Sequence, residues 1–284
     1  MACSNDKLTE ANTSDVESEK NGGFLWKVSN GGTIMYLFGT IHLGKNTFFP
    51  LDPIVEKAFE QSDVVMPEIN TNDSSMDQET LMKLAMFDDE TTLDQVLSDE
   101  LYRDLTVILK SYDLDIKNFH PFEPWLLDLM LLDFATAESN VDSAKSVDLY
   151  LLNKAEEMGK QIIPIESEDV QSKIFSSFTL ETQVQTLRRT VQQFENLPKE
   201  TEQSAEDWLN RDSEAFKQTR KRFDDAGINK EYFEQINDRR NIIMSQKLVQ
   251  ALQSTLDQTY FVFVGTFHVV LEPSLPTLLK KTRI

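Results

Sequence analysis

Phe38-Gly39-Thr40-Ile41-His42 and Val264-Gly265-Thr266-Phe267-His268 stand near opposite ends of the sequence. Each motif runs from an apolar residue through Gly-Thr and one further apolar residue to a histidine. The chain has only 3 histidines and 9 glycines, so the two motifs use scarce residues. A single histidine after a strand is more often a hydrogen-bonded loop residue. The repetition favours a different interpretation, in which His42 and His268 form two halves of one functional site.

The composition is that of a soluble protein with one large domain or two closely packed ones. The 284 residues are enough to bury a substantial hydrophobic core. A net charge of −20 argues against a nucleic-acid-binding protein, which needs basic patches to contact phosphates. No run of about 18 apolar residues is present, so we expect no transmembrane helix.

Residues 1–23 are predicted to form a disordered polar tail that contains the single cysteine, Cys3. One cysteine excludes an internal disulfide. The sequence around Cys3 resembles the mature end of a bacterial lipoprotein, in which the cysteine carries lipid and the tail is a tether. This interpretation predicts an extracytoplasmic protein whose only membrane contact is that lipid. The alternative is an incidental cysteine on a disordered cytoplasmic terminus.

Strand signals recur along residues 24–284. Residues 24–38 read as a β-hairpin around the turn 29–32, and further strands are expected over 63–68, 161–166 and 260–264. A helix over 50–61 lies between the first two of these regions. Strand, helix and strand in such a short stretch form a βαβ unit, which requires parallel pairing.

We therefore predict an α/β fold with a central, mainly parallel sheet flanked by helices. Residues 24–284 would form a single domain. Its core would come from about 24–70, 145–172 and 229–284, with one helix over 229–256. Residues of about 71–144 and 173–228 show mainly helical patterns, and the second stretch is charged. These helical portions predict an α-helical insertion that forms a cap.

Four predicted strands end close to His42, Glu68, Glu166 and His268. Ligands of open parallel sheets bind outside the carboxyl ends of the strands. Two imidazoles and two carboxylates at that edge suit a divalent transition metal with an open coordination position. Such a metal acidifies its bound water and polarises a carbonyl. The alternative for Glu68 and Glu166 is capping of the helices that follow them.

Other polar residues leave two interpretations open. Arg239 and Arg240 are either solvated helix charges, or one of them turns inward to hold a carboxylate or the substrate. His120 lies in a proline-rich break and is expected to be a loop residue, and Trp125 is expected to pack in the core. No Gly-x-Ser-x-Gly motif occurs, which argues against the familiar serine hydrolases.

The motifs resemble the TraB/GumN family, which includes the Tiki proteases and is grouped with ChaN-like and erythromycin-esterase-like proteins. The resemblance extends from about Trp26 to the C-terminus. Besides the two Gly-Thr-x-His motifs it rests on Val65-Met66-Pro67-Glu68, Pro124-Trp125, Ser146-Val147-Asp148, Ile165-Glu166 and Arg240-Asn241. Phe267 stands where the family usually has a small residue, which predicts a tighter or more apolar pocket floor.

The resemblance implies the same α/β fold and a metal-dependent peptidase that acts on a peptide or protein substrate, typically with Mn or Co and alternatively with Zn. His42 and His268 would be metal ligands, Glu68 would be a metal ligand or the general base, and Glu166 and Arg240 would join them in the catalytic set. Supporting roles would fall to Gly39, Gly265, Asp148 and Asn241. Two other functions remain open: a non-catalytic surface lipoprotein that binds a peptide signal or haem, and a metal-free esterase-like hydrolase with histidine as the base.

Overall fold

The predicted hairpin is present in the structure. The computed structural model describes residues 9–10, 22–73, 78–254 and 257–282. Cys3 and most of the predicted tail lie outside these residues. The strands β2 (Phe24–Asn30) and β3 (Thr33–Thr40) pair antiparallel across Gly31 and Gly32. Gly31 has a φ of 58°, a conformation that favours glycine in a tight turn.

The sheet is built around β6 (Thr259–Gly265). This strand lies between β3 and β4 (Val64–Pro67) and runs parallel to both. Next to β4 lies the parallel β5 (Gln161–Ile162), and the short β1 (Thr9–Glu10) pairs antiparallel with β2. The order is β1-β2-β3-β6-β4-β5. The predicted class, an α/β fold with a mainly parallel sheet, is therefore confirmed.

The register between β3 and β6 brings the two motifs together. Strand β6 is apolar and almost entirely buried, as expected for a central parallel strand covered on both faces. Thr40, at the end of β3, is directly paired with Gly265, at the end of β6. The two Gly-Thr-x-His motifs, more than 200 residues apart in sequence, therefore leave neighbouring strands at the same edge.

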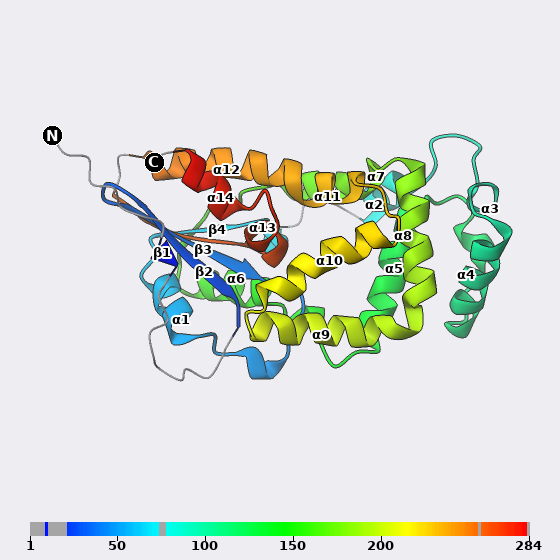
Figure 1. Cartoon of the computed structure of the whole chain (residues 1–284), viewed down its shortest axis with the longest axis horizontal. Helices are drawn as coiled ribbons and strands as arrows, with labels where there is room; N and C mark the ends of the chain where they lie inside the picture. Colours follow the sequence, from blue (N-terminus) through cyan, green and yellow to red (C-terminus); the bar gives the residue numbers. More distant parts are fainter. Residues whose placement is uncertain (1–8, 11–21, 74–77, 255–256, 283–284) are drawn as a thin grey trace.

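Helices cover both faces of this sheet (Figure 1), with α12 and α14 on one face and α1 and α6 on the other. The α-helices of the described residues are α1 (Pro53–Glu60), α2 (Gln78–Leu84), α3 (Leu93–Val96), α4 (Asp99–Ser111), α5 (Pro124–Ala137), α6 (Val147–Glu157), α7 (Glu168–Ser176), α8 (Leu180–Gln193), α9 (Leu197–Leu209), α10 (Ser213–Asp225), α11 (Glu231–Phe233), α12 (Arg239–Leu252), α13 (Thr266–Val270) and α14 (Leu275–Lys281). Short 3₁₀ helices lie at Asn46–Phe48, Thr71–Asp73, Ile116–Phe119, Ser143–Lys145 and Phe194–Asn196.

Local sequence explains how individual helices begin and which face they bury. In α1 the Asp52 carboxylate accepts the N–H of Ile54 at 2.8 Å, and Pro53 occupies the first turn. In α12 the buried residues recur at helical spacing, which leaves an apolar stripe against the sheet. Burial of the apolar stripe determines which face of such a helix packs against the sheet.

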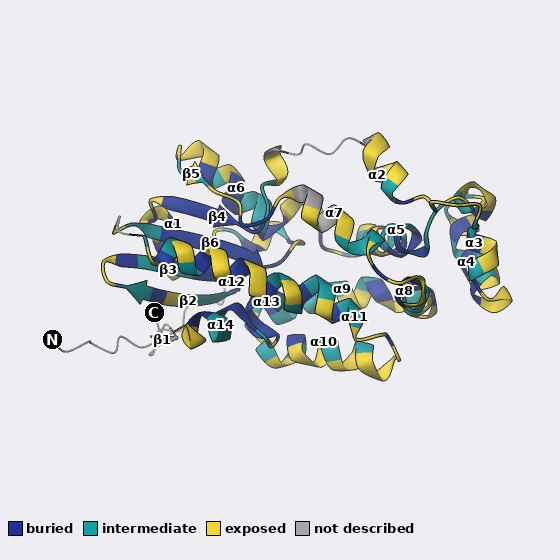
Figure 2. Ribbon diagram, turned by 90° about the horizontal axis from the view of Figure 1, so that it is seen from above, coloured by how far each residue is buried: buried dark blue, intermediate teal, exposed yellow. Residues whose placement is uncertain are grey.

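A second hydrophobic cluster lies away from the sheet. Leu105, Leu109, Leu127, Leu131 and Leu187 are fully buried there, on α4, α5 and α8. Figure 2 shows these helices at the opposite end of the molecule from the β-hairpin. The helices predicted for 71–144 and 173–228 are thus present, whereas their role as an inserted cap stays a prediction.

Three predicted details were wrong. The strand over 161–166 is much shorter, because only Gln161 and Ile162 form β5, although the N–H groups of Ile163 and Ile165 still bond to residues of β4. The helix over 229–256 is interrupted by a π-helical turn, Glu234–Asp238, and α12 ends at Leu252. The two strands of the predicted βαβ unit are parallel but do not pair directly, because β6 lies between β3 and β4.

Trp208 on α9 connects the long helical segment to the first histidine motif. Its side chain is fully buried, stacks on Phe48 with ring centroids 5.4 Å apart, and contacts Phe38 edge-on. The indole N–H donates to the Gly39 carbonyl at 2.9 Å. This bond fixes α9 against the end of β3, next to the candidate site.

We predict that Trp208→Phe lowers the free energy of unfolding by about 1–3 kcal/mol, because it removes a buried hydrogen bond and leaves a carbonyl less well satisfied. Urea unfolding followed by circular dichroism measures the change. Trp26→Phe on β2, where the ring is only partly buried, is the matched control. Equal losses in the two variants would show that the bond to Gly39 contributes nothing.

Candidate functional site

A pocket of about 360 Å³ opens at the carboxyl edge of the sheet. Its floor includes His42, Glu68, Arg240, Gly265 and His268. These residues come from the ends of β3, β4 and β6, from the start of α12 and from α13. The helices α7, α9, α10 and α11 supply the walls, which include the side chains of Ile174, Phe175, Ser204, Phe216 and Tyr232.

His42 lies on the open side of this pocket. Its side chain is 68 % exposed, and its Nδ1 lies 3.0 Å from Asp148 Oδ2. The attraction of the Asp148 carboxylate raises the pKa of His42 to about 9, against an opposing effect of desolvation. Because most of the ring is exposed, solvent screens part of this attraction.

His268 is held differently, in a buried position on α13. Its Nδ1 lies 2.6 Å from the Asn241 side-chain oxygen. The Asn241 amide nitrogen donates to the carbonyls of Pro273 at 2.8 Å and of His268 at 3.2 Å. The amide oxygen therefore faces the ring and acts as an acceptor, so His268 Nδ1 carries the proton and Nε2 faces Glu68. The distance from Nε2 to Glu68 Oε1 is 3.6 Å.

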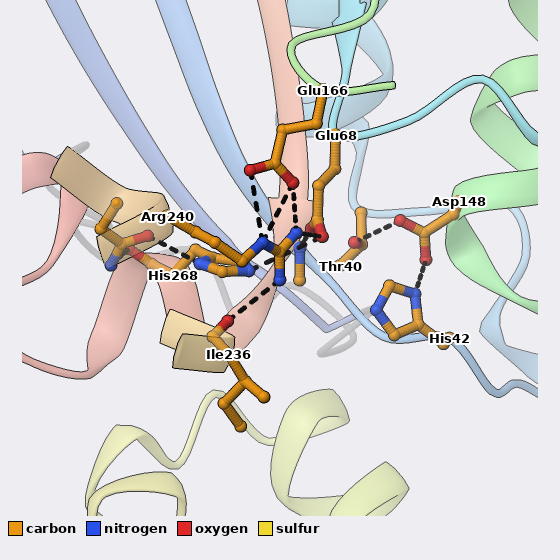
Figure 3. Close-up of polar contacts among 10 residues, drawn as sticks. Thr40, His42, Glu68, Asp148, Glu166, Ile236, Arg240 and His268 are labelled. Carbon is orange, nitrogen blue, oxygen red and sulfur yellow. Dashed lines mark hydrogen bonds and ion pairs between the residues drawn. The ribbon is translucent and has the colours of Figure 1, made fainter. Parts of the chain in front are cut away.

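Arg240 joins two buried carboxylates, Glu68 and Glu166 (Figure 3). Its Nε and Nη2 donate to Glu166 Oε2 at 3.0 and 2.5 Å, and Nη2 also donates to Glu68 Oε1. Burial alone would raise the pKa of Glu68, but His268, Arg240 and His42 outweigh it and hold that pKa well below its usual range. The pKa of Arg240 is raised despite its burial, because Glu68 and Glu166 favour its charged form. Glu68 and Arg240 are therefore both charged at neutral pH.

Gly265 leaves an open space between the predicted ligands. A β-carbon at this position would lie 3.3 Å from His42 Nε2, 3.6 Å from Glu68 Oε2 and 3.8 Å from His268 Cδ2. The N–H of Gly265 donates to Glu68 Oε2 at 2.8 Å. The absence of a side chain here allows groups from three separate segments to surround one point.

The donors around this point are of the kind that Mn, Co or Zn binds: two imidazole nitrogens and one carboxylate. Both imidazoles also have Nδ1 occupied, as is usual for metal-ligating histidines. In the described residues, however, no three or more His, Cys, Asp or Glu side chains are grouped closely enough to hold an ion directly. The residues therefore match a metal in donor type and border the space at Gly265, but they would have to move closer together to hold an ion, and Glu68 would share its carboxylate with Arg240.

The structure brings together nearly all of the residues predicted from sequence. His42, Glu68, Arg240 and His268 line the pocket floor, and Glu166 is bound to Arg240. Asp148, Asn241 and Gly265 contact His42, His268 and Glu68, respectively. Of the two arginines, Arg240 turns inward while the side chain of Arg239 is 66 % exposed.

Gly39 was predicted to support the site, but in the structure it faces α13. A β-carbon there would lie 2.6 Å from a methyl group of Val269, so Gly39 permits close packing of β3 against α13. His120 and Trp125 are placed as expected: His120 bonds to the Tyr102 hydroxyl at 2.9 Å, away from the pocket, and Trp125 is buried.

Sequence reasoning missed three contributions to the site. The hydroxyl of Thr40 contacts Asp148, and that of Thr266 contacts the Thr40 carbonyl. The threonine repeated in the two motifs was the sequence feature that could have indicated these contacts. Of the aromatic residues around the pocket, the sequence indicated only Phe267. Phe267 packs edge-on against Phe216, which also lines the pocket, and against the buried Phe233.

We predict that Arg240→Met lowers the free energy of unfolding by about 3–5 kcal/mol, because it leaves two buried carboxylates without their cation. Lys83→Met, which removes an exposed ion pair with Glu79, should change it by less than about 1 kcal/mol. Urea titration compares the two. The added changes Glu68→Gln and Glu166→Gln should restore part of the loss. An Arg240→Met variant as stable as the control would rule out the proposed role of this cluster.

The His42–Asp148 pair predicts a pH-dependent stability. The pKa of His42 is raised above its unfolded value of about 6.5, so the stabilisation is complete below that pH and is lost as pH rises through about 9. The difference in unfolding free energy between the wild type and Asp148→Asn should therefore be largest near pH 6 and shrink by pH 10. Urea unfolding at several pH values measures it. A difference that stays constant over this range contradicts the assignment.

The whole sequence was also compared with known proteins. No curated protein and no solved structure matches it significantly. In the described part of the chain, no helix is long and apolar enough to cross a membrane. A match to the TraB/PrgY/gumN family extends over residues 24–284, which include the sheet, the pocket and both histidine motifs. The chain therefore belongs to the TraB/PrgY/gumN family.

Proposed function

We propose that this protein is a hydrolase that cleaves a peptide bond at the pocket floor, with a divalent metal ion held by His42, Glu68 and His268. The observation that carries the proposal is the space at Gly265, which is surrounded by His42 Nε2, Glu68 Oε2 and the His268 ring. The resemblance to the Tiki branch of the family supports peptide hydrolysis. The pocket volume of about 360 Å³ is sufficient for a short stretch of an extended peptide.

The residues around this space would have separate tasks. Asp148 and Asn241 hold the Nδ1 atoms of the two histidines, which leaves the Nε2 atoms to face the pocket. When bound, a divalent ion supplies such a site with a water of lowered pKa and polarises a carbonyl group. Mn and Co are the metals the resemblance implies, with Zn as the alternative.

The electrostatics favour a ligand role for Glu68. Its pKa is held well below the usual range, and a carboxylate with so low a pKa is a weak proton acceptor at neutral pH. It remains ionised and is thus available as an anionic donor. Arg240 and the Gly265 N–H restrain its two oxygens, so its position depends little on the substrate.

One observation favours a second candidate, a metal-free hydrolase. The His42–Asp148 pair has the arrangement of a general base and the residue that orients it, with Nε2 facing the pocket. In this case His42 in its neutral form, which becomes populated as pH rises toward the raised pKa of about 9, would take the proton of the attacking water. The two candidates share the same residues and differ in their response to chelation.

We also propose that the protein acts outside the cytoplasm, anchored through lipid on Cys3. Support for this comes only from the sequence around that cysteine. Mass spectrometry of the protein purified from membranes would detect the acyl chains on Cys3.

The test uses the full chain, treated with a chelator and then supplied with Mn²⁺, Co²⁺ or Zn²⁺, against a peptide library read by mass spectrometry. We expect cleavage that requires one of these metals and falls at least about 100-fold in His42→Ala and in His268→Ala. His120→Gln, which changes the histidine outside the pocket, should keep its activity.

The other outcomes separate the alternatives. Cleavage that survives chelation but is lost in His42→Ala would replace the metal-dependent proposal with the metal-free one. Tight binding of a peptide or of haem without turnover under any metal would identify a binding protein and contradict both hydrolase proposals.

A further inference from the structure

Thr40 occupies a position between the two halves of the site. It is the last residue of β3, it is 1 % exposed, and it pairs with Gly265 across the sheet. Its hydroxyl lies 2.7 Å from Asp148 Oδ1, while Asp148 Oδ2 lies 3.0 Å from His42 Nδ1. One carboxylate thus connects a buried threonine to the exposed histidine (Figure 3).

The direction of these hydrogen bonds follows from the chemistry of the groups. An ionised carboxylate can only accept, so the Thr40 hydroxyl and the His42 Nδ1–H both donate to Asp148. Each of the two carboxylate oxygens then has its own donor. Rotation of the Asp148 carboxylate would break both bonds, so the hydroxyl of Thr40 restrains the acceptor that orients His42.

Backbone contacts fix the same loop independently of this hydroxyl. The Val147 N–H donates to the Ile41 carbonyl at 3.1 Å, and Gly44 and Asp142 exchange two backbone hydrogen bonds at 3.0 Å. These bonds hold the segment after β3 against the start of α6. Loss of the Thr40 hydroxyl should therefore leave the loop in place and affect mainly the Asp148 side chain.

The second motif uses its threonine in another way. The Thr266 hydroxyl donates to the backbone carbonyl of Thr40 at 2.8 Å, and His268 is oriented by Asn241. The two Gly-Thr-x-His motifs are therefore not equivalent. Only the threonine of the first motif contacts the residue that orients a histidine.

We propose that Thr40 is a positioning residue that holds the Asp148 carboxylate and thereby selects the His42 tautomer with the proton on Nδ1 and the lone pair of Nε2 facing the pocket. A carboxylate partner of this kind sets which ring nitrogen carries the proton. The consequence for catalysis rests on the proposed hydrolase function, whereas the tautomer itself does not.

The first experiment needs no activity. Nitrogen-15 NMR through the ring carbon-bound protons reports the tautomer of each of the 3 histidines in the metal-free full chain, at a pH where the rings are neutral. We expect the Nδ1–H tautomer of His42 in the wild type and in Thr40→Ser, which keeps the hydroxyl. In Thr40→Val, which has a similar shape without the hydroxyl, the population should move toward the Nε2–H tautomer, as in Asp148→Asn.

The second experiment is a double-mutant cycle on the cleavage activity. Thr40→Val should lower kcat about 10-fold with little change in KM, because groups that orient a ligand or base typically contribute 10–100-fold. Thr40→Ser should restore most of it. In the Asp148→Asn background, Thr40→Val should have almost no further effect, because the two residues act through one contact.

The proposal is overturned if Thr40→Val keeps the wild-type tautomer of His42, or if its effect on kcat adds fully to that of Asp148→Asn. A wild type without peptidase activity removes the hydrolase proposal alone, because the NMR comparison still decides the role of Thr40. Circular dichroism and urea unfolding of Thr40→Val show whether the variant is folded, and Thr40→Ser supplies the informative comparison if it is not.

Discussion

The buried contact of Arg240 with Glu68 and Glu166 is the constraint on which the arrangement of the site depends. Two carboxylates cannot be buried side by side as anions without a cation, because desolvation and mutual repulsion both oppose their charge. The planar guanidinium bonds to both of them. It thereby fixes three segments that are far apart in sequence: the end of β4, the chain after β5 and the start of α12.

The positions of the two histidines follow from this constraint. Asn241 follows Arg240 on α12, so the same helix that places the guanidinium also places the amide that orients His268. The central position of β6 between β3 and β4 then sets Gly265 between that ring and His42. Buried His268 is restrained by packing and by Asn241. Exposed His42 depends on a charged partner, Asp148, and on the threonine that holds it.

Much of the fold followed from local patterns. The hairpin and the buried run of β6 needed only strand-forming residues, a Gly-Gly turn and parallel topology. The pairing of β3 with β6 did not follow from them, because the predicted βαβ unit placed β3 next to β4, whereas β6 lies between the two. The strand predicted to begin at Gln161 was too long. The apolar residues after Ile162 still bond to β4, but they do not continue the regular strand pairing. The interruption of the helix over 229–256 was missed, because a π-helical turn has no distinct composition. It adds a residue to one turn and thereby shifts the helix faces before it relative to those of α12.

The sequence by itself determined the chemistry of the site and its edge of the sheet: two histidines and two glutamates at strand ends, in a chain that belongs to the TraB/PrgY/gumN family. Only the tertiary structure decided that Arg240 pairs with both carboxylates, that Asp148 and Thr40 hold His42, and that Gly265 leaves space between the side chains. The physical reason is the range of the interactions. Strand and helix preferences are set by neighbouring residues, whereas these contacts join residues 74 to 197 positions apart and exist only once the sheet and α12 have packed.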